Sequence, residues 1–212
     1  MLNSSGFDLW ADGYDKSVQL SEEDDAYPFA GYKKVLGAVY RSIRESRGTK
    51  VLDMGLGTAV LTQRLYQDGY EIFGLDFSEK MLEIAREKMP GARLIQYDFS
   101  WGFPPAFAGE RFDFIVCTYD IHHLDDRQKV ELIRELLPHL TEEGLILIGD
   151  VAFQTAEELA ECRRASGGLW DEEELYMVEE TMSREIPNLH FEKLSFCSGV
   201  FTITKQAHGG TK

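Results

Sequence analysis

The sequence predicts a doubly wound α/β fold with a mostly parallel, seven-stranded sheet that ends in a C-terminal antiparallel hairpin strand. Two observations predict this fold. Between residues 50 and 151, short apolar runs alternate with segments of helical spacing, which is typical of parallel strands joined by helices. Residues 190–205 then read as two strands that meet near Ser198 and Gly199, and a turn this short forces antiparallel pairing.

The first predicted strand leads into a glycine-rich turn. In residues 50–61, KVLDMGLGTAVL, apolar strand residues precede Gly55 and Gly57, and a helical pattern opens at Thr58. Two glycines beside a helix N-terminus let a ligand approach backbone N–H groups and the positive end of the helix dipole. This geometry suits a nucleotide-like ligand, although glycine pairs also serve as ordinary turns.

Three successive predicted strands close with an acid, namely Asp53, Asp76 and Asp98. Ligands of open α/β sheets lie along the carboxyl edge, and an acid about 20 residues past the glycines is placed to accept the hydroxyls of a ribose. Each aspartate alone could instead cap the turn that follows it. Three in succession, together with the glycines, favour a ligand site.

A second polar stretch, TYDIHHLDD, follows the fourth predicted strand, residues 112–118, and places His122 and His123 at the same edge. Histidine titrates near neutral pH, so both are candidate catalytic bases, with Tyr14 of the N-terminal segment as a third candidate catalytic residue. A structural role is the alternative for each histidine. Two adjacent histidines without a third ligand at a fixed spacing do not define a metal site, so no metal is predicted.

Two further helices are predicted outside this core pattern. Pro28 suits the first turn of a helix that runs to about Ser46, and residues 171–186 read as a helix that Pro187 stops. The expected division of the chain is an N-terminal helical arm or lid over the pocket (1–47), a ligand-binding domain (48–206) and a disordered tail (207–212).

Composition narrows the class of protein. The chain has 212 residues, enough for one domain with a sizeable core, and its formal net charge of −15 argues against nucleic acid or an anionic membrane as a partner. It contains no apolar run near the roughly 18 residues that a membrane span needs, and its N-terminus does not read as a secretory signal. Three cysteines without a CxxC pair are consistent with reduced thiols, so we expect a cytoplasmic protein.

The segments VLDMGLGTA, LDFSEKML, YDF and CTYDIHHL, in this order, resemble the class I S-adenosylmethionine-dependent methyltransferases. The resemblance covers roughly residues 8–205 and is greatest to small bacterial methyltransferases of the ubiquinone/menaquinone-biosynthesis-like group, among them uncharacterised members with an HHL signature. It implies a Rossmann-like fold, S-adenosylmethionine as cofactor, and methyl transfer to a small-molecule acceptor.

The resemblance also implies roles for individual residues at the cofactor. Asp53, Gly55 and Gly57 would hold the methionyl end. Asp76 would take the ribose hydroxyls, and Phe77 would flank the adenine ring.

The next two segments would complete the cofactor site. Asp98 would accept the adenine amino group with Phe99 beside the ring, and Thr118 would contribute backbone near the sulfonium. Met81, in the segment after the second strand, is a further cofactor-binding candidate. In the family pattern a third glycine usually stands at the position of Ala59, so a methyl group replaces it here.

Two other functions share parts of this pattern. A nicotinamide-dependent oxidoreductase would also have a glycine-rich turn after the first strand and an acid after the second. Its sequence motif, however, has a glycine where this chain has Val60. A regulatory module could keep the cofactor pocket without catalysis, because a fold alone does not settle function. Turnover separates an enzyme from such a module.

Overall fold

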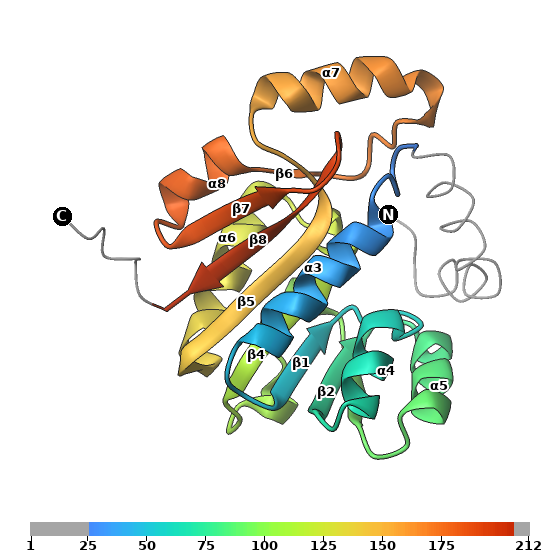
Figure 1. The fold of residues 1–212 in the computed structure, drawn as a ribbon, viewed down its shortest axis with the longest axis vertical. Coiled ribbons are helices and arrows are strands. Elements are labelled where there is room, and N and C mark those ends of the chain that lie inside the picture. Colours follow the sequence, from blue (N-terminus) through green and yellow to red (C-terminus); the bar gives the residue numbers. More distant parts are fainter. Residues whose placement is uncertain (1–25, 206–212) are drawn as a thin grey trace.

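The computed structural model describes residues 26–205, and they form one sheet with helices on both faces (Figure 1). The strand order is β3-β2-β1-β4-β5-β8-β7, and the short β6 pairs with β5 off this path. The strands are β1 (Lys50–Met54), β2 (Glu71–Asp76), β3 (Arg93–Gln96), β4 (Phe112–Thr118), β5 (Leu140–Phe153), β6 (Met177–Val178), β7 (Leu189–Lys193) and β8 (Ser198–Thr204).

The pairing directions confirm the predicted fold class. Strands β1 to β5 pair in parallel with their neighbours, whereas β8 runs antiparallel to both β5 and β7. Central strands of such a sheet are covered on both faces, which is why β1 and β4 read as nearly continuous apolar runs. Both β1 and β4 are paired with a strand on each side, and their carboxyl ends lie at the same end of the sheet.

The helices divide between the two faces of the sheet. They are α3 (Tyr32–Glu45), α4 (Val60–Gln67), α5 (Glu79–Lys88), α6 (Asp126–Leu136), α7 (Ala156–Ser166) and α8 (Glu179–Glu185), with 3-10 turns η1 (Phe99–Trp101), η2 (Pro105–Phe107), η3 (Ile121–His123), η4 (Leu137–His139) and η5 (Gly167–Leu169).

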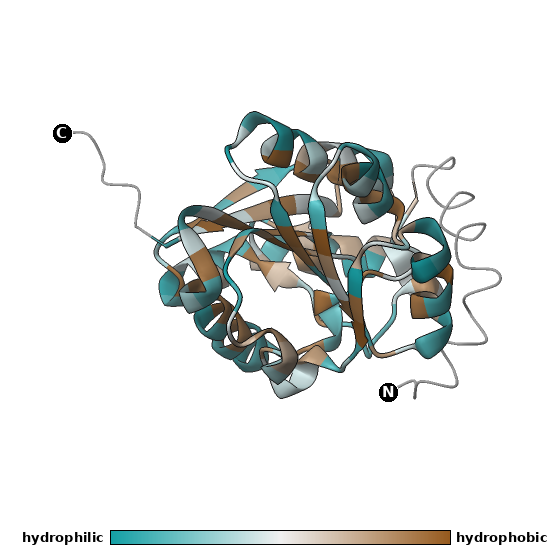
Figure 2. Cartoon of the chain, turned by 90° about the horizontal axis from the view of Figure 1, so that it is seen from below, coloured by the Kyte–Doolittle hydropathy of each residue, from teal (hydrophilic) through white to brown (hydrophobic). Residues whose placement is uncertain are grey.

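Neighbouring strand residues point to opposite faces, so each face has its own apolar cluster. Val51 packs in one cluster with residues of α3, α4 and α5, such as Val35, and Leu52 packs in the other with residues of α6 and α8, such as Ile133. Figure 2 shows the apolar residues concentrated on the strands and on the inward sides of the helices.

The expected helix over residues 171–186 is wrong in its first half. Residues 171–176 have no helical structure, β6 pairs in parallel with the end of β5, and α8 is limited to Glu179–Glu185. Tyr176, Met177 and Val178 are buried in succession, a pattern that a one-sided surface helix cannot produce. Tertiary pairing with β5 thus overrides the local helical propensity.

The hairpin turn also lies elsewhere than expected. The antiparallel direction is confirmed, but the turn occupies residues 194–197, where the carbonyl of Ser198 accepts hydrogen bonds from the N–H groups of Leu194 and Ser195. Gly199 lies within β8, where a Cβ would stand 2.4 Å from the ring of Phe191. This glycine is therefore required by close packing and does not mark the turn.

The first described helix begins four residues after Pro28. Gly31 precedes α3 with a φ of 79°, a left-handed conformation that changes the chain direction before the helix. Within α3, Val35 and Val39 fill the space above Gly149 on β5, so this helix belongs to the layer that covers the sheet. Tyr14, with residues 1–25 of the predicted arm, and the predicted tail, residues 207–212, lie outside the described residues.

Candidate cofactor and acceptor site

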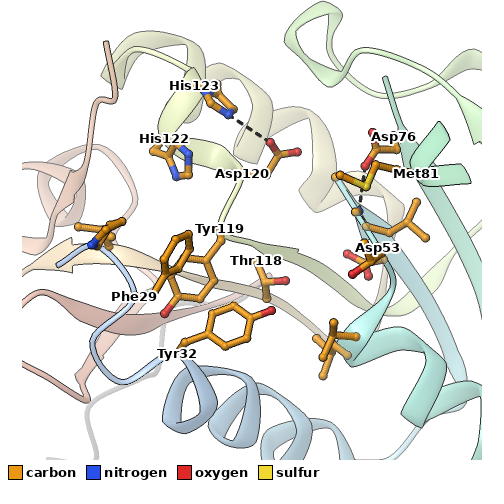
Figure 3. Close-up of a pocket in the computed structure, with 18 of the residues that line it drawn as sticks. Phe29, Tyr32, Asp53, Asp76, Met81, Thr118, Tyr119, Asp120, His122 and His123 are labelled. Atoms are coloured by element: carbon orange, nitrogen blue, oxygen red, sulfur yellow. Dashed lines mark hydrogen bonds and ion pairs between the residues drawn. The ribbon is translucent and has the colours of Figure 1, made fainter. Parts of the chain in front are cut away.

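One cavity of about 440 Å³ lies at the carboxyl ends of β1, β2 and β4 (Figure 3). Its walls include nine residues that the sequence singled out: Asp53, Gly55, Gly57, Asp76, Phe77, Met81, Thr118, His122 and His123. The structure therefore brings most of the candidate residues together, and their individual roles stay predictions.

The turn after β1 depends on left-handed backbone. Gly55 and Gly57 have φ angles of 72° and 51°, and the N–H groups of Gly55 and Leu56 both donate to the carbonyl of Leu75 at the end of β2. A Cβ on Gly55 would stand 1.6 Å from Oδ2 of Asp120, so no larger residue fits there. Ala59 also has a positive φ, 60°, which gives a physical reason for the glycine that the family pattern has at this position.

Asp53 brings a buried, unpartnered carboxylate oxygen to the cavity wall. Its side chain is buried; Oδ2 accepts a hydrogen bond from the hydroxyl of Thr62 at 2.9 Å, and Oδ1 has no partner among the described residues. Burial, offset in part by this bond and reinforced by the charge of Asp76, raises the pKa of Asp53 to about 7. A buried carboxylate oxygen without a donor is costly, so it fits a ligand that brings a positive charge or an N–H group.

Asp76 is held in place by the backbone around it. Oδ2 accepts a hydrogen bond from the N–H of Gly57 and Oδ1 accepts one from the N–H of Ser78, each at 2.8 Å. A carboxylate has about four acceptor positions, so both oxygens can still accept hydroxyl protons. The residues present thus fit a cofactor with a cationic end and a ribose.

Asp98 and Phe99 do not line this cavity. Asp98 accepts a hydrogen bond from the N–H of Ser100 and caps η1, and Phe99 packs among the apolar residues of one sheet face. Their contact with adenine stays a prediction. The side-chain amide of Gln96 instead reaches the carbonyl of Phe77 beside the cavity.

His122 is fixed by a partner that the sequence analysis did not identify. Its Nδ1 lies 2.9 and 3.1 Å from the two carboxylate oxygens of Asp150 on β5, and its Nε2 lies 3.6 Å from Oε1 of Glu174. Burial alone lowers the pKa of His122, but the charge and hydrogen bond of Asp150, with the charge of Glu174, outweigh it and raise the pKa to about 9. His122 is therefore an imidazolium at neutral pH.

His123 is uncharged at neutral pH, unlike His122. Burial and the neighbouring charge of His122 lower the pKa of His123 to about 4, so this ring is neutral at pH 7. Its Nε2 lies 3.6 Å from Oδ1 of Asp120, a carboxyl whose own pKa is raised well above its usual value by burial and by the charge of Asp76. The two adjacent histidines are thus chemically distinct, which their order in the sequence did not indicate.

Residues 170–176, here called the closing segment, contribute Asp171, Glu173 and Glu174 to the cavity wall. Trp170 stacks on Tyr27 with ring centroids 5.1 Å apart, and the hydroxyl of Tyr27 contacts that of Tyr176. The N–H of Leu175 donates to the carbonyl of His122 at 2.8 Å.

Sequence reasoning did not place Asp150 or Glu174 at the site. Asp150 was detectable, because it follows the apolar run GLILIG as the other acids follow their strands. Glu174 was not detectable, since it was assigned to a helix that does not form.

The fold and this cavity define a class of protein: a doubly wound α/β protein with a nucleotide-cofactor cradle at the carboxyl edge of its sheet. Comparison with known proteins narrows the class. A family model described as a methyltransferase domain matches residues 51–144.

Curated relatives and solved structures agree with this match. An uncharacterised methyltransferase of Oceanobacillus iheyensis is 35% identical over 71% of this chain and 68% of its own length, and one of Bacillus licheniformis is 30% identical over 95% and 91%. The magnesium protoporphyrin IX methyltransferase of Synechocystis, solved with bound S-adenosylhomocysteine, has a TM-score of 0.65 at 18% identity and covers 83% of this chain and 84% of its own. An S-adenosylmethionine-dependent methyltransferase of Clostridium acetobutylicum has a TM-score of 0.65 at 16% identity and covers 90% and 98%. These two structures show the shared fold.

The chain belongs to the methyltransferase family of these relatives, and it has the fold of the S-adenosylmethionine-dependent methyltransferases of known structure. Among residues 26–205, no helix is long and apolar enough to cross a membrane. Within the same residues, no group of three or more histidine, cysteine or acidic side chains is arranged to hold a metal ion.

Proposed function

We propose that this chain methylates a small-molecule acceptor inside the cavity and that the nine predicted wall residues divide between cofactor and acceptor. The observation that carries this proposal is the single cavity, about 440 Å³ in volume, in which the glycine turn after β1 and the histidine turn after β4 face the same space. That volume is in the usual range of small-molecule sites.

The cofactor end is the glycine turn with its two acids. S-adenosylmethionine supplies a methyl group on a cationic sulfur, which keeps the electron pair of the broken carbon–sulfur bond while the lone pair of the acceptor forms the new bond. Asp76, anchored by the N–H groups of Gly57 and Ser78, accepts the ribose hydroxyls. Asp53 offers its free Oδ1 to the cationic methionyl end. Phe77, Met81 and the backbone of Thr118 complete this end.

The acceptor end orients the nucleophile and keeps water out. Displacement at a methyl carbon needs alignment more than acid or base strength, and alignment alone can lower a barrier by several kcal/mol. Apolar side chains of Phe29, Leu36 and Val151 line the cavity beside the histidines. An acceptor that must lose a proton finds His122 as a general base once this ring is neutral.

The charge state of His122 sets the pH dependence. Asp150 and Glu174 face His122 directly and Asp120 lies on the same turn, and all three raise the pKa of His122. His123, on the same turn, is neutral at pH 7. Because the pKa of His122 is about 9, the fraction of neutral base rises steeply from pH 7 and reaches one half at about pH 9. We expect methylation of a proton-bearing acceptor to increase between pH 7 and 9, whereas a base role for His123 would give a rate that is flat in this range.

Calorimetric titration with S-adenosylmethionine, S-adenosylhomocysteine and NAD tests the cofactor assignment of these residues. We expect the first two to bind and NAD not to bind. Binding of NAD alone would contradict the assignment and return the histidines to hydride-transfer chemistry. Tight binding of S-adenosylmethionine without turnover across a broad acceptor panel would favour a regulatory module.

Three broader assignments belong to the same proposal. The HHL segment supports membership in the ubiquinone/menaquinone-biosynthesis-like group. The net charge of −15 supports a small acceptor in place of nucleic acid. Cys117, Cys162 and Cys197 are free thiols, which supports a cytoplasmic location.

A further inference from the structure

The end of the cavity away from the glycine turn has an aromatic wall. Phe29, Tyr32 and Tyr119 lie together there, with ring centroids 5.6 Å apart for Phe29 and Tyr119, 4.9 Å for Tyr32 and Tyr119, and 6.0 Å for Phe29 and Tyr32 (Figure 3). Phe29 and Tyr32 both line the cavity. Aromatic faces attract cations as well as apolar groups.

Acidic side chains outnumber cations around the cavity. Among the described residues that line it there is no lysine or arginine, and His122 is the one ring held as a cation at neutral pH. The acidic residues are Asp53, Asp76, Asp120, Asp171, Glu173 and Glu174. The last three belong to the closing segment, so the acceptor end has its own carboxylates in addition to those at the cofactor end.

Glu174 is the carboxylate that faces the acceptor space from a fixed position. The hydroxyl of Tyr176 donates to Oε2, and Oε1 lies 3.6 Å from Nε2 of His122. The positive charge of His122 is already shared with Asp150, which accepts at Nδ1 through both oxygens. One imidazolium between two carboxylates leaves a net negative charge, and Glu174 keeps further acceptor positions open to a ligand.

The segment that carries Glu174 is anchored on several sides. The carbonyl of Leu175 accepts a hydrogen bond from the buried Nζ of Lys129, and its N–H donates to the carbonyl of His122. Trp170 packs on Tyr27 at an interplanar angle of 13°. The carboxylate is therefore held in position before a ligand arrives, which lowers the cost of binding.

Building on the proposed function, we propose that the acceptor is a small amine with an apolar or aromatic body, bound as its ammonium ion by Glu174 and packed against Phe29 and Tyr32. An anionic acceptor would enter a space with six acidic side chains and lose its hydration without a free cation in return. A neutral acceptor would leave the charge of Glu174 and its neighbours unbalanced. The ammonium group serves for binding, and the nucleophilic atom can be another atom of the same molecule.

Binding of matched probes to the protein saturated with S-adenosylhomocysteine tests this inference. The probes are phenethylamine, phenethyl alcohol and phenylacetate, with hexylamine and hexanol as a second pair, each titrated calorimetrically at pH 7. We expect both amines to bind at least about tenfold more tightly than their alcohols and phenylacetate not to bind, because one charge-assisted hydrogen bond supplies about tenfold or more.

Two variants test whether Glu174 is responsible for the preference for amines. Glu174→Gln keeps an acceptor for Tyr176 and should weaken amine binding about tenfold while leaving the affinities for alcohols and S-adenosylhomocysteine unchanged. Glu161→Gln makes the same chemical change at an exposed position on α7 and should alter none of them.

Several results would overturn the inference. These are equal or tighter binding of an alcohol or of phenylacetate, amine binding that is unaffected in Glu174→Gln, and absence of amine binding to a protein that does bind S-adenosylhomocysteine. Failure of S-adenosylhomocysteine to bind the unmodified protein would instead refute the proposed function and the inference with it.

Discussion

Replacing Asp150 with asparagine isolates the ion pair that sets the charge of His122. Both side chains are buried, at 1% and 8% exposure, so solvent screens their interaction little. Asparagine preserves the size of the side chain and a hydrogen-bond acceptor but removes the charge, and we expect the pKa of His122 to fall by more than about one unit, since Asp150 is the main group that raises it.

The stability effect of this change follows from the two pKa values. Since the pKa of His122 is raised from 6.5 to about 9 in the folded protein, protonation stabilises the fold. The contribution is fully present below pH 6.5 and is lost as pH rises through 9. At 1.36 kcal/mol per unit, the loss between pH 7 and 10 is about 2.5 kcal/mol in the unmodified protein and should be no more than about 1 kcal/mol in Asp150→Asn.

Urea unfolding at pH 7 and pH 10, with an NMR titration of the His122 ring, measures both quantities. Glu161→Gln serves as the control, because it removes an exposed carboxylate on α7 and should follow the pH dependence of the unmodified protein. An Asp150→Asn variant with the same pH dependence of unfolding as the unmodified protein, or with a His122 pKa still near 9, would refute the ion-pair reasoning.

Three further substitutions test the glycine turn and the acid beside it. Asp76→Ala should weaken S-adenosylmethionine binding by about 2 kcal/mol in calorimetry, the typical loss for charge-assisted hydrogen bonds, whereas Asp68→Ala at the end of α4 should leave it unchanged; equal affinities would remove Asp76 from the site. Ala59→Gly should raise the free energy of unfolding by about 0.5–1 kcal/mol. A left-handed backbone costs alanine about 1–2 kcal/mol, and the greater backbone entropy that glycine loses on folding offsets part of that gain. A variant that is less stable in urea unfolding would show that Ala59 is not strained. Gly55→Ala should abolish cofactor binding, because its Cβ would stand 1.6 Å from Oδ2 of Asp120. Adding Asp120→Ala should restore the fold in part. Identical thermal melting of the single and double variants would show that the collision is relieved in another way.

The fold was predictable because its signals are local. The strand and turn over residues 50–61 show the apolar run, the glycines and the acid in direct succession, and the structure places them as β1, a left-handed turn and α4. Residues 171–178 have no such signal. Their conformation is set by pairing with β5 and by the hydrogen bond from the N–H of Leu175 to the carbonyl of His122, and both partners lie far away in the sequence.

The different charge states of His122 and His123 could not be predicted from the sequence for a similar reason. His122 and His123 are neighbours with the same intrinsic pKa, and they differ because Asp150 faces only the first. That contact depends on the register between β4 and β5, in which Thr118 pairs with Gly149, and on the turn that follows Thr118. The sequence contains all the residues involved but does not specify this register.

The two ends of the cavity therefore differ in how the chain builds them. Apart from Thr118, the proposed cofactor end comes from one contiguous unit, β1 to α5, so a short motif suffices to identify most of it. The acceptor end combines the start of α3, the turn after β4 and the segment before β6, which meet only through tertiary contacts. A fold that keeps the first end and varies the second can serve many acceptors, which is why shared cofactor residues identify a family and why the acceptor has to be inferred from the charges and rings of this particular chain.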